Sequence, residues 1–323
     1  MALWYVNMVY ERGHDRTRII SARKAIKEET GISLPESYKP VSFAVRKRKN
    51  VLCSNSLKEC YCTAKMKNEI IAVLNECNSL GINQQLDYDK FYLYSIITHS
   101  TAIEDSTITE IENQVLFDNG ISCSKPISEQ FMNLDLKKAY EQSFDFARKH
   151  EKITVGFLCS LSGTLMKNTD SSYNTVAGYF SSAKGELRLL NVSAGRGGKS
   201  YLAWQKVPDR LQEFCGWLNE ELEKTDSDDI ENAYKLSFES HFKLASIHPW
   251  ADGNGRMDRL LMNMVKYEKN LVPSIVKKER CAEYIKVISE SQDAEDSASL
   301  IVFMFNHHIQ NLKQQIEEYK RSL

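Results

Sequence analysis

Residues 248–259, His-Pro-Trp-Ala-Asp-Gly-Asn-Gly-Arg-Met-Asp-Arg, constrain the fold more than any other part of this chain. Just before them, residues 230–247 repeat apolar and small side chains at three- and four-residue spacing, which predicts an amphipathic helix with one buried face. Pro249 disfavours the α conformation at His248, so this helix should end there and present the imidazole. A further apolar run predicts a second helix that Arg256 opens. We therefore expect a sharp junction between two helices.

This junction has the composition of an anion-binding site. The Asp-Gly-Asn-Gly run at residues 252–255 can take positive φ angles at three consecutive positions, which lets backbone N–H groups converge on one point. The N-terminus of the second helix adds partial positive charge there. Arg256 and Arg259 are three residues apart and share a helix face, where both guanidinium groups can hold phosphate oxygens. Asp252 is placed to hold Mg²⁺, which prefers one or two carboxylates together with substrate phosphates.

The same stretch resembles the signature of the Fic (Fido) family of nucleotidyltransferases, and every specified position matches. His241 and Ile247 also stand where many family members have these residues. The resemblance extends over roughly residues 86–310, and it is strongest between 233 and 265. It implies an all-α protein, with a Fic-type helical core and a small β-hairpin flap.

What the resemblance implies for function is transfer of AMP from ATP to a Ser, Thr or Tyr hydroxyl of a target protein. His248 would be the base that takes the hydroxyl proton, a role that suits an imidazole. Asp252 would hold Mg²⁺ between the α- and β-phosphates, and Arg256 and Arg259 would hold the β- and γ-phosphate sides. The backbone amides that would cradle the phosphates belong to Gly253, Asn254 and Gly255. Trp250 is interpreted as an apolar anchor of the loop.

Two further family features have counterparts in this chain. Ser100 and Glu104 fit the pattern of an inhibitory helix near residues 99–105, whose glutamate pairs with the second arginine and blocks productive ATP binding. Asp105 departs from that pattern, which has Gly or Asn at this place. Tyr284 lies where family members line the adenine pocket.

Residues 187–202 resemble the family's β-hairpin flap, on which the target protein docks. Their short extended pieces are separated by serine and glycine, which is typical of a hairpin. Ser181 stands where many members have an arginine, so this alignment is approximate.

The rest of the sequence mainly limits the alternatives. Residues 1–85 have helical and irregular pieces of unknown role, and residues 311–323 form a polar tail. The 42 basic and 43 acidic residues are balanced, which indicates no nucleic-acid or membrane footprint. No signal peptide or transmembrane run is evident. Scattered cysteines, including Cys53, Cys60 and Cys62, indicate free thiols in a reducing cytoplasm. The basic run at residues 46–49 is interpreted as a solvated loop.

Several alternatives stay open at this stage. The enzyme could remove AMP from a target, or use another nucleotide or phosphorylated donor. A catalytically silent regulatory module is a different class of protein, but the catalytic positions are intact. The target protein and the formation of a homo-oligomer cannot be derived from the chain.

Overall fold

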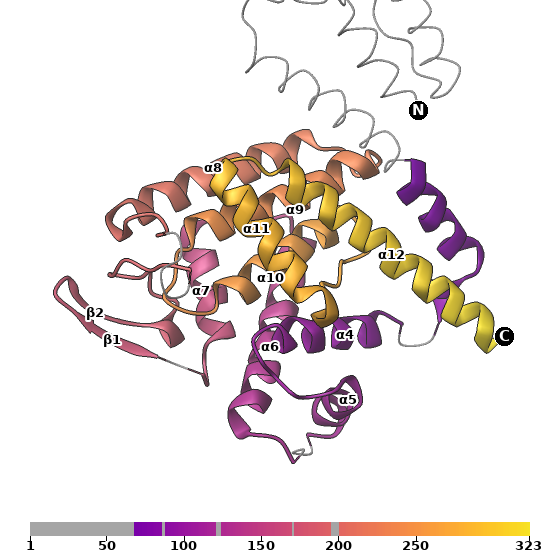
Figure 1. Ribbon diagram of the computed structural model, residues 1–323, viewed down its shortest axis with the longest axis horizontal. Coiled ribbons are helices and arrows are strands. Elements are labelled where there is room, and N and C mark those ends of the chain that lie inside the picture. Colours follow the sequence, from indigo (N-terminus) through magenta and orange to yellow (C-terminus); the bar gives the residue numbers. More distant parts are fainter. Residues whose placement is uncertain (1–67, 86–87, 121–123, 170, 195–199) are drawn as a thin grey trace, which may run out of the picture. The chain divides into compact units, whose positions relative to one another are not determined.

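The computed structural model describes residues 68–85, 88–120, 124–169, 171–194 and 200–323. These residues are mainly helical and include one two-stranded antiparallel sheet, as expected for an all-α protein with a hairpin (Figure 1). The elements, after a helix at 68–79, are α4 (Tyr88–Ala102), α5 (Glu110–Asn119), α6 (Ile127–Arg148), α7 (Val155–Leu165), β1 (Ser172–Thr175), β2 (Gly178–Ser181), α8 (Val207–Lys224), α9 (Ile230–Ile247), α10 (Asn254–Glu268), α11 (Cys281–Ala294) and α12 (Ala298–Ser322). The basic run at 46–49 and the cysteines at 53, 60 and 62 lie outside the described residues.

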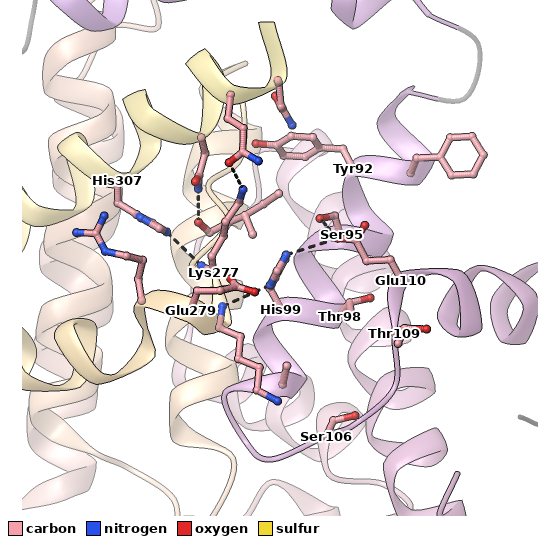
Figure 2. Close-up of a pocket in the computed structure, with 18 of the residues that line it drawn as sticks. Tyr92, Ser95, Thr98, His99, Ser106, Thr109, Glu110, Lys277, Glu279 and His307 are labelled. Atoms are coloured by element: carbon pink, nitrogen blue, oxygen red, sulfur yellow. Dashed lines mark hydrogen bonds and ion pairs between the residues drawn. The ribbon is translucent and has the colours of Figure 1, made fainter. Parts of the chain in front are cut away.

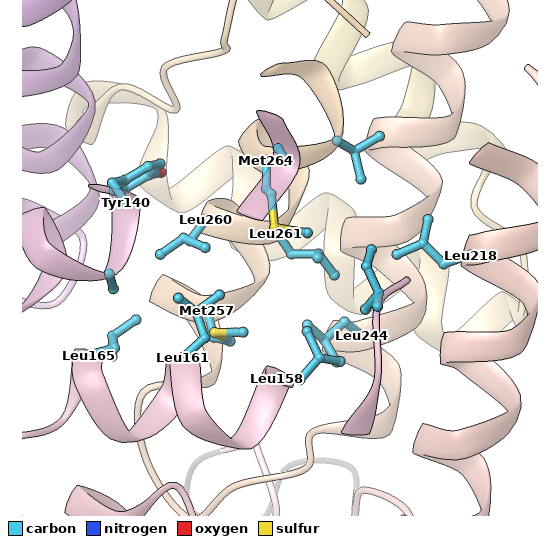
Figure 3. Packing of buried hydrophobic residues seen from close by; sticks show 14 of the residues in the cluster. Tyr140, Leu158, Leu161, Leu165, Leu218, Leu244, Met257, Leu260, Leu261 and Met264 are labelled. Atoms are coloured by element: carbon cyan, nitrogen blue, oxygen red, sulfur yellow. The ribbon is translucent and has the colours of Figure 1, made fainter. Parts of the chain in front are cut away.

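Helix α10 is the centre of the larger apolar cluster, and it packs against α9, α6 and α4. Its residues from Arg256 to Lys266 are all buried, whereas an ordinary surface helix buries one face. Figure 3 shows Met257, Leu260 and Met264 of α10 among leucines of α7, α8 and α9. Since the site residues precede and begin this helix, the core holds their backbone rigidly.

A second apolar cluster joins the start and the end of the described chain. Ile70 and Val73 pack in it with Leu312 and Ile316 of α12. The polar tail expected at residues 311–323 is thus the last part of α12, and residues 68–82 pack with it. Residues on either side of the boundaries expected at 85 and 310 thus bury apolar side chains in one cluster.

A hairpin forms earlier in the chain than residues 187–202, where we expected one. Strands β1 and β2 pair Ser172 with Ser181 and Thr175 with Gly178, and the turn between them uses φ 133° at Gly178. Within residues 187–194 and 200–202 the pairing is limited to one isolated bridge, between Ser193 and Ser200. Because residues 195–199 lie outside the described part of the chain, the hairpin expected at residues 187–202 stays a prediction, and Arg188 binds the start of this segment to the end of α9. Within the described part of the chain, no helix combines the length and apolar character that a bilayer-spanning segment needs.

Candidate functional site

The helix α9 ends at Ile247, and His248 is its C-terminal cap, as Pro249 predicted. The backbone of His248 is left-handed, with φ 51° and ψ 63°, and its N–H still donates to the Leu244 carbonyl at 3.0 Å. A left-handed non-glycine residue is uncommon and must be held by its surroundings. The site therefore begins with a histidine whose backbone is under constraint.

The imidazole of His248 is stacked on Tyr201, with ring centroids 3.8 Å apart and planes 15° apart. Its carbonyl oxygen accepts a hydrogen bond from Arg188 Nε at 2.8 Å. Burial, and then the positive charge of Arg188, lower the pKa of His248 to about 4, although a hydrogen bond to the Ala245 backbone opposes them. The imidazole is thus neutral near pH 7 and has a lone pair that can accept a proton.

Helix α10 begins at Asn254, two residues before Arg256, where we expected it to start. Gly253 caps it with φ 78°, and it is the one residue of 252–255 with positive φ, so the expected run of three such residues was wrong. A Cβ on Gly253 would lie 2.7 Å from Met166 Sδ. The backbone amides of this stretch are therefore first-turn helix donors, which bind an anion through the helix N-terminus.

The side chains of Asn254 and Trp250 stabilise this turn through hydrogen bonds. Asn254 Oδ1 accepts from the Trp250 backbone N–H at 3.1 Å, and its Nδ2 donates to the Trp250 carbonyl at 2.8 Å. The Trp250 indole is fully buried and donates to the Gly185 carbonyl at 3.1 Å. Trp250 is thus an apolar anchor of the loop, as expected, and the side chain of Asn254 contributes to its shape.

Arg256 is buried beside the α10 N-terminus without a full set of partners. It is 4% exposed, and its Nη2 lies 3.3 Å from Met166 Sδ and 4.0 Å from an Asp252 oxygen. Among the described residues, its Nε and Nη1 have no hydrogen-bond acceptor. Unsatisfied buried guanidinium donors cost free energy, so their position next to a helix N-terminus indicates a bound anion.

Arg259, in contrast, donates through Nε and Nη2 to the two residues that the sequence pattern singled out. It is 3% exposed, its Nε donates to Ser100 Oγ at 2.9 Å, and its Nη2 donates to the Ser100 carbonyl at 3.0 Å. The same Nη2 donates to Glu104 Oε1 at 2.8 Å. Burial raises the pKa of Glu104, but Arg259 and Arg256 outweigh it and the net shift is downward. The carboxylate is therefore ionised near neutral pH.

Glu104 also lies over the first turn of α10. A Cβ built on Gly255 would be 2.9 Å from Glu104 Oε1, so the glycine makes room for the carboxylate. Helix α4 ends at Ala102, and Asp105 takes φ 67° in the turn that follows. Aspartate tolerates this left-handed conformation, which explains how it can replace the expected Gly or Asn.

Tyr284 is buried, whereas a residue that lines an adenine pocket must present its ring to the base. It is 2% exposed, its hydroxyl is 2.7 Å from His241 Nε2, and it also hydrogen-bonds Arg259. Burial, with Arg259 and Lys266, lowers the pKa of His241 to about 3. In this structure Tyr284 supports Arg259 from behind and offers no open ring face to a base.

Sequence reasoning missed two buried charged residues at this site. Arg188 lies in a segment that was predicted to be extended, but its spacing to the signature carries no signal. Asp258 is inside the signature stretch at an unspecified position; it is 3% exposed, and its Oδ1 has no hydrogen-bond partner among the described residues. Burial raises the pKa of Asp258 well above its usual value.

The Asp252 side chain fits a magnesium ion that arrives with a nucleotide. It is 50% exposed, and its Oδ1 accepts from the Gly253 N–H at 2.6 Å. The described residues contain no cluster of three His, Cys, Asp or Glu side chains that could hold a metal by themselves. One carboxylate beside an anion site is what Mg²⁺ needs when phosphates supply the other ligands.

A groove of about 960 Å³ lies along the side of α4, next to the turn that carries Glu104 (Figure 2). His99 of α4 crosses it. Its Nε2 is 3.5 Å from Glu110 Oε1, and its Nδ1 accepts from the Lys278 N–H at 3.4 Å. His248 and residues 252–259 do not line this groove, whereas Ala102 and Ser106, on either side of Glu104 in the sequence, do.

Comparisons with known proteins agree with this arrangement. The sequence model of the Fic/DOC family matches residues 152–265. Protein adenylyltransferase fic-1 of Caenorhabditis elegans is 26% identical over 199 residues, which are 61% of this chain and 35% of that protein. Protein adenylyltransferase Fic of Drosophila erecta is 26% identical over 201 residues, covering 58% of this chain and 35% of the relative. The chain thus spans about a third of the length of these curated relatives.

Solved structures show the same fold. A Fic domain containing signaling protein from Bacteroides thetaiotaomicron has a TM-score of 0.63 at 21% identity, covering 78% of this chain and 97% of that one. Fic-1 from C. elegans also has a TM-score of 0.63, at 17% identity, covering 95% of this chain and 85% of that one. The match to the Fic/DOC family model, which spans residues 152–265, therefore includes the signature at the α9–α10 junction and the core helices around it.

Proposed function

We propose that this protein transfers AMP from ATP to a hydroxyl group of a protein, and that Glu104 restrains the reaction. The observation that carries the proposal is the α9–α10 junction, where the neutral imidazole of His248 immediately precedes an anion-binding helix N-terminus. The family relationship, and relatives that are named protein adenylyltransferases, support the same reaction.

In the proposed reaction, the hydroxyl oxygen of the target attacks the α-phosphorus of ATP. His248 accepts the hydroxyl proton as the new O–P bond forms, and pyrophosphate leaves with the electrons of the broken P–O bond. The first-turn amides of α10 and the Arg256 guanidinium stabilise the charge on the phosphates. The unsatisfied Nε and Nη1 of Arg256 support this role, because phosphate oxygens would supply their missing acceptors. Magnesium bound at Asp252 would neutralise phosphate charge.

The inhibitory part of the proposal depends on Arg259. Glu104 and Ser100 accept from its Nε and Nη2, so these two groups cannot hold a phosphate while the contacts persist. The Glu104 carboxylate also places negative charge over the first turn of α10, where the terminal phosphates of ATP would bind. We expect the pair to act as a switch, because breaking it frees a buried arginine for the nucleotide.

The target is proposed to dock beside residues 187–194 and 200–202, because this segment contacts the backbone of His248 and its ring. Its described part forms one isolated antiparallel bridge, between Ser193 and Ser200, and we propose that an extended target segment adds main-chain hydrogen bonds beside it.

The test is intact-mass analysis of the purified protein after incubation with Mg²⁺ and ATP. We expect a gain of one AMP mass, larger in Glu104→Gly and absent when His248→Ala is added. Glu104→Gln is the matched control, since it keeps the shape but removes the charge. No AMP on any variant, on the protein itself or on proteins of a cell lysate, would contradict the proposal, and a gain from another nucleotide would identify a different donor.

A further inference from the structure

Arg188 is a buried arginine whose contacts converge on the catalytic histidine. It is 1% exposed, its Nε donates to the His248 carbonyl at 2.8 Å, and its Nη1 donates to the Leu190 carbonyl at 2.8 Å. Its Nη2 donates to the Leu202 carbonyl, and its backbone N–H donates to the Pro249 carbonyl at 3.1 Å. One side chain thus links the end of α9 to two points of the proposed docking segment, Leu190 and Leu202.

The chemistry of these contacts explains why arginine stands here. The guanidinium hydrogen bonds to described residues all go to backbone carbonyls, in three directions. A lysine ammonium cannot reproduce this planar, rigid fork. Because burial of a charge without a carboxylate is costly, a residue needed only for packing would be better apolar. The cost suggests that the charge and the fork have a function.

Arg188 contacts the backbone of His248 and the residue next to the ring that stacks on its imidazole. Its bond to the carbonyl supports the left-handed backbone of His248, which the helix alone would not favour. Its bond to Leu202 holds the residue next to Tyr201, whose ring is stacked on His248. The orientation of the His248 imidazole therefore depends on the position of residues 190 and 202.

We propose that Arg188 is a positioning residue that couples the target-docking segment to His248, so that a target bound along residues 187–194 and 200–202 brings the base into line with its hydroxyl. The effect on catalysis rests on the proposed function. The contacts of Arg188 are observed independently of that function.

The coupling has an electrostatic component that a purely structural residue would lack. Among the described residues, the titratable groups that face His248 are Arg188 and Tyr201. Burial is the largest cause that lowers the pKa of His248, and the positive charge of Arg188 is the second. Removal of the charge should raise that pKa, and Arg188→Lys should keep it low.

The experiment compares Arg188→Gln, Arg188→Lys and a surface control, Arg210→Gln, in the Glu104→Gly background. The control arginine is 60% exposed and pairs with Glu213. Nitrogen NMR of labelled histidine follows the titration of His248, which is assigned with His248→Ala. Initial rates against ATP and against a target protein or the self-modified site give kcat and KM at several pH values.

We expect Arg188→Gln to raise the pKa of His248 and to lower kcat by about 100-fold through misplacement of the base. The KM for ATP should stay near that of the control. Arg188→Lys should keep the pKa low and recover part of kcat. An unchanged His248 titration in Arg188→Gln, or equal losses in the Gln and Lys variants that follow thermal stability, would overturn the inference. If the parent protein transfers no AMP, the proposed function fails, while the NMR titration still tests the link between Arg188 and His248.

Discussion

Glu104 Oε1 accepts a hydrogen bond from Arg259 Nη2 at 2.8 Å, across 155 residues of sequence. The arginine is 3% exposed and the glutamate side chain 36% exposed, so the pair is buried from one side and reachable from the other. A ligand that approaches from the open side can therefore displace the carboxylate while Arg259 stays in place.

Substitution of Glu104 should activate the enzyme. Charge-assisted hydrogen bonds contribute about 1.5–3 kcal/mol, which corresponds to about a 10- to 150-fold change in an equilibrium. We expect Glu104→Gly to increase self-modification with radiolabelled ATP by about tenfold or more, and Glu104→Gln to increase it less. Equal labelling of wild type and both variants would contradict an inhibitory role.

The activity should be insensitive to pH around neutrality. The pKa of His248 is lowered from its ordinary value to about 4, so the base is neutral from pH 8 down to about pH 5. We expect kcat/KM in the Glu104→Gly background to fall by half near pH 4 on this account, and His248→Ala to lower it about a thousandfold at neutral pH. An acid limb centred near the ordinary histidine value of about 6.5 would show that the imidazole is not shielded.

Asp258 should make the protein less stable as the pH rises. Burial raises its pKa in the folded state, so the unfolded chain releases the proton first, and ionisation favours unfolding above the ordinary pKa of about 3.9. Each pKa unit between the folded and the unfolded state changes the free energy of unfolding by about 1.4 kcal/mol. Asp258→Asn should therefore raise the free energy of unfolding by about 1 kcal/mol or more at pH 8 and have little effect near pH 4. Urea unfolding at the two pH values measures this, and a variant less stable at pH 8 would show a needed carboxylate.

Asp252→Asn should weaken nucleotide binding only when Mg²⁺ is present. The amide keeps the oxygen that accepts from the Gly253 N–H, so the turn should persist, whereas the metal loses a charged ligand. Titration calorimetry in the Glu104→Gly background, with Mg²⁺ or with EDTA, compares the two cases. A loss of affinity that is equal in both would assign Asp252 a structural role.

The parts of the site that depend on residues adjacent in sequence could be predicted from the sequence. Pro249 after His248 indicated the end of α9, and the Asp-Gly-Asn-Gly run indicated an anion site at a helix start. The local conformation was less predictable: three residues can adopt positive φ, but Asn254 and Gly255 join α10 because its buried core extends the helix to them. The two-stranded sheet at residues 172–181 was not predicted, and its short, polar strands give a weak sequence signal.

The sequence by itself determined the junction of α9 and α10, because a proline and glycines restrict the backbone through local sterics alone. Only the tertiary structure decided which distant groups meet there. Arg259 meets Ser100 and Glu104, and His248 meets Arg188 and Tyr201, because packing around α10 brings the end of α4 and residues 188 and 201 to one end of this helix. Such contacts depend on packing between elements far apart in the chain, and residue spacing within one segment carries no record of them.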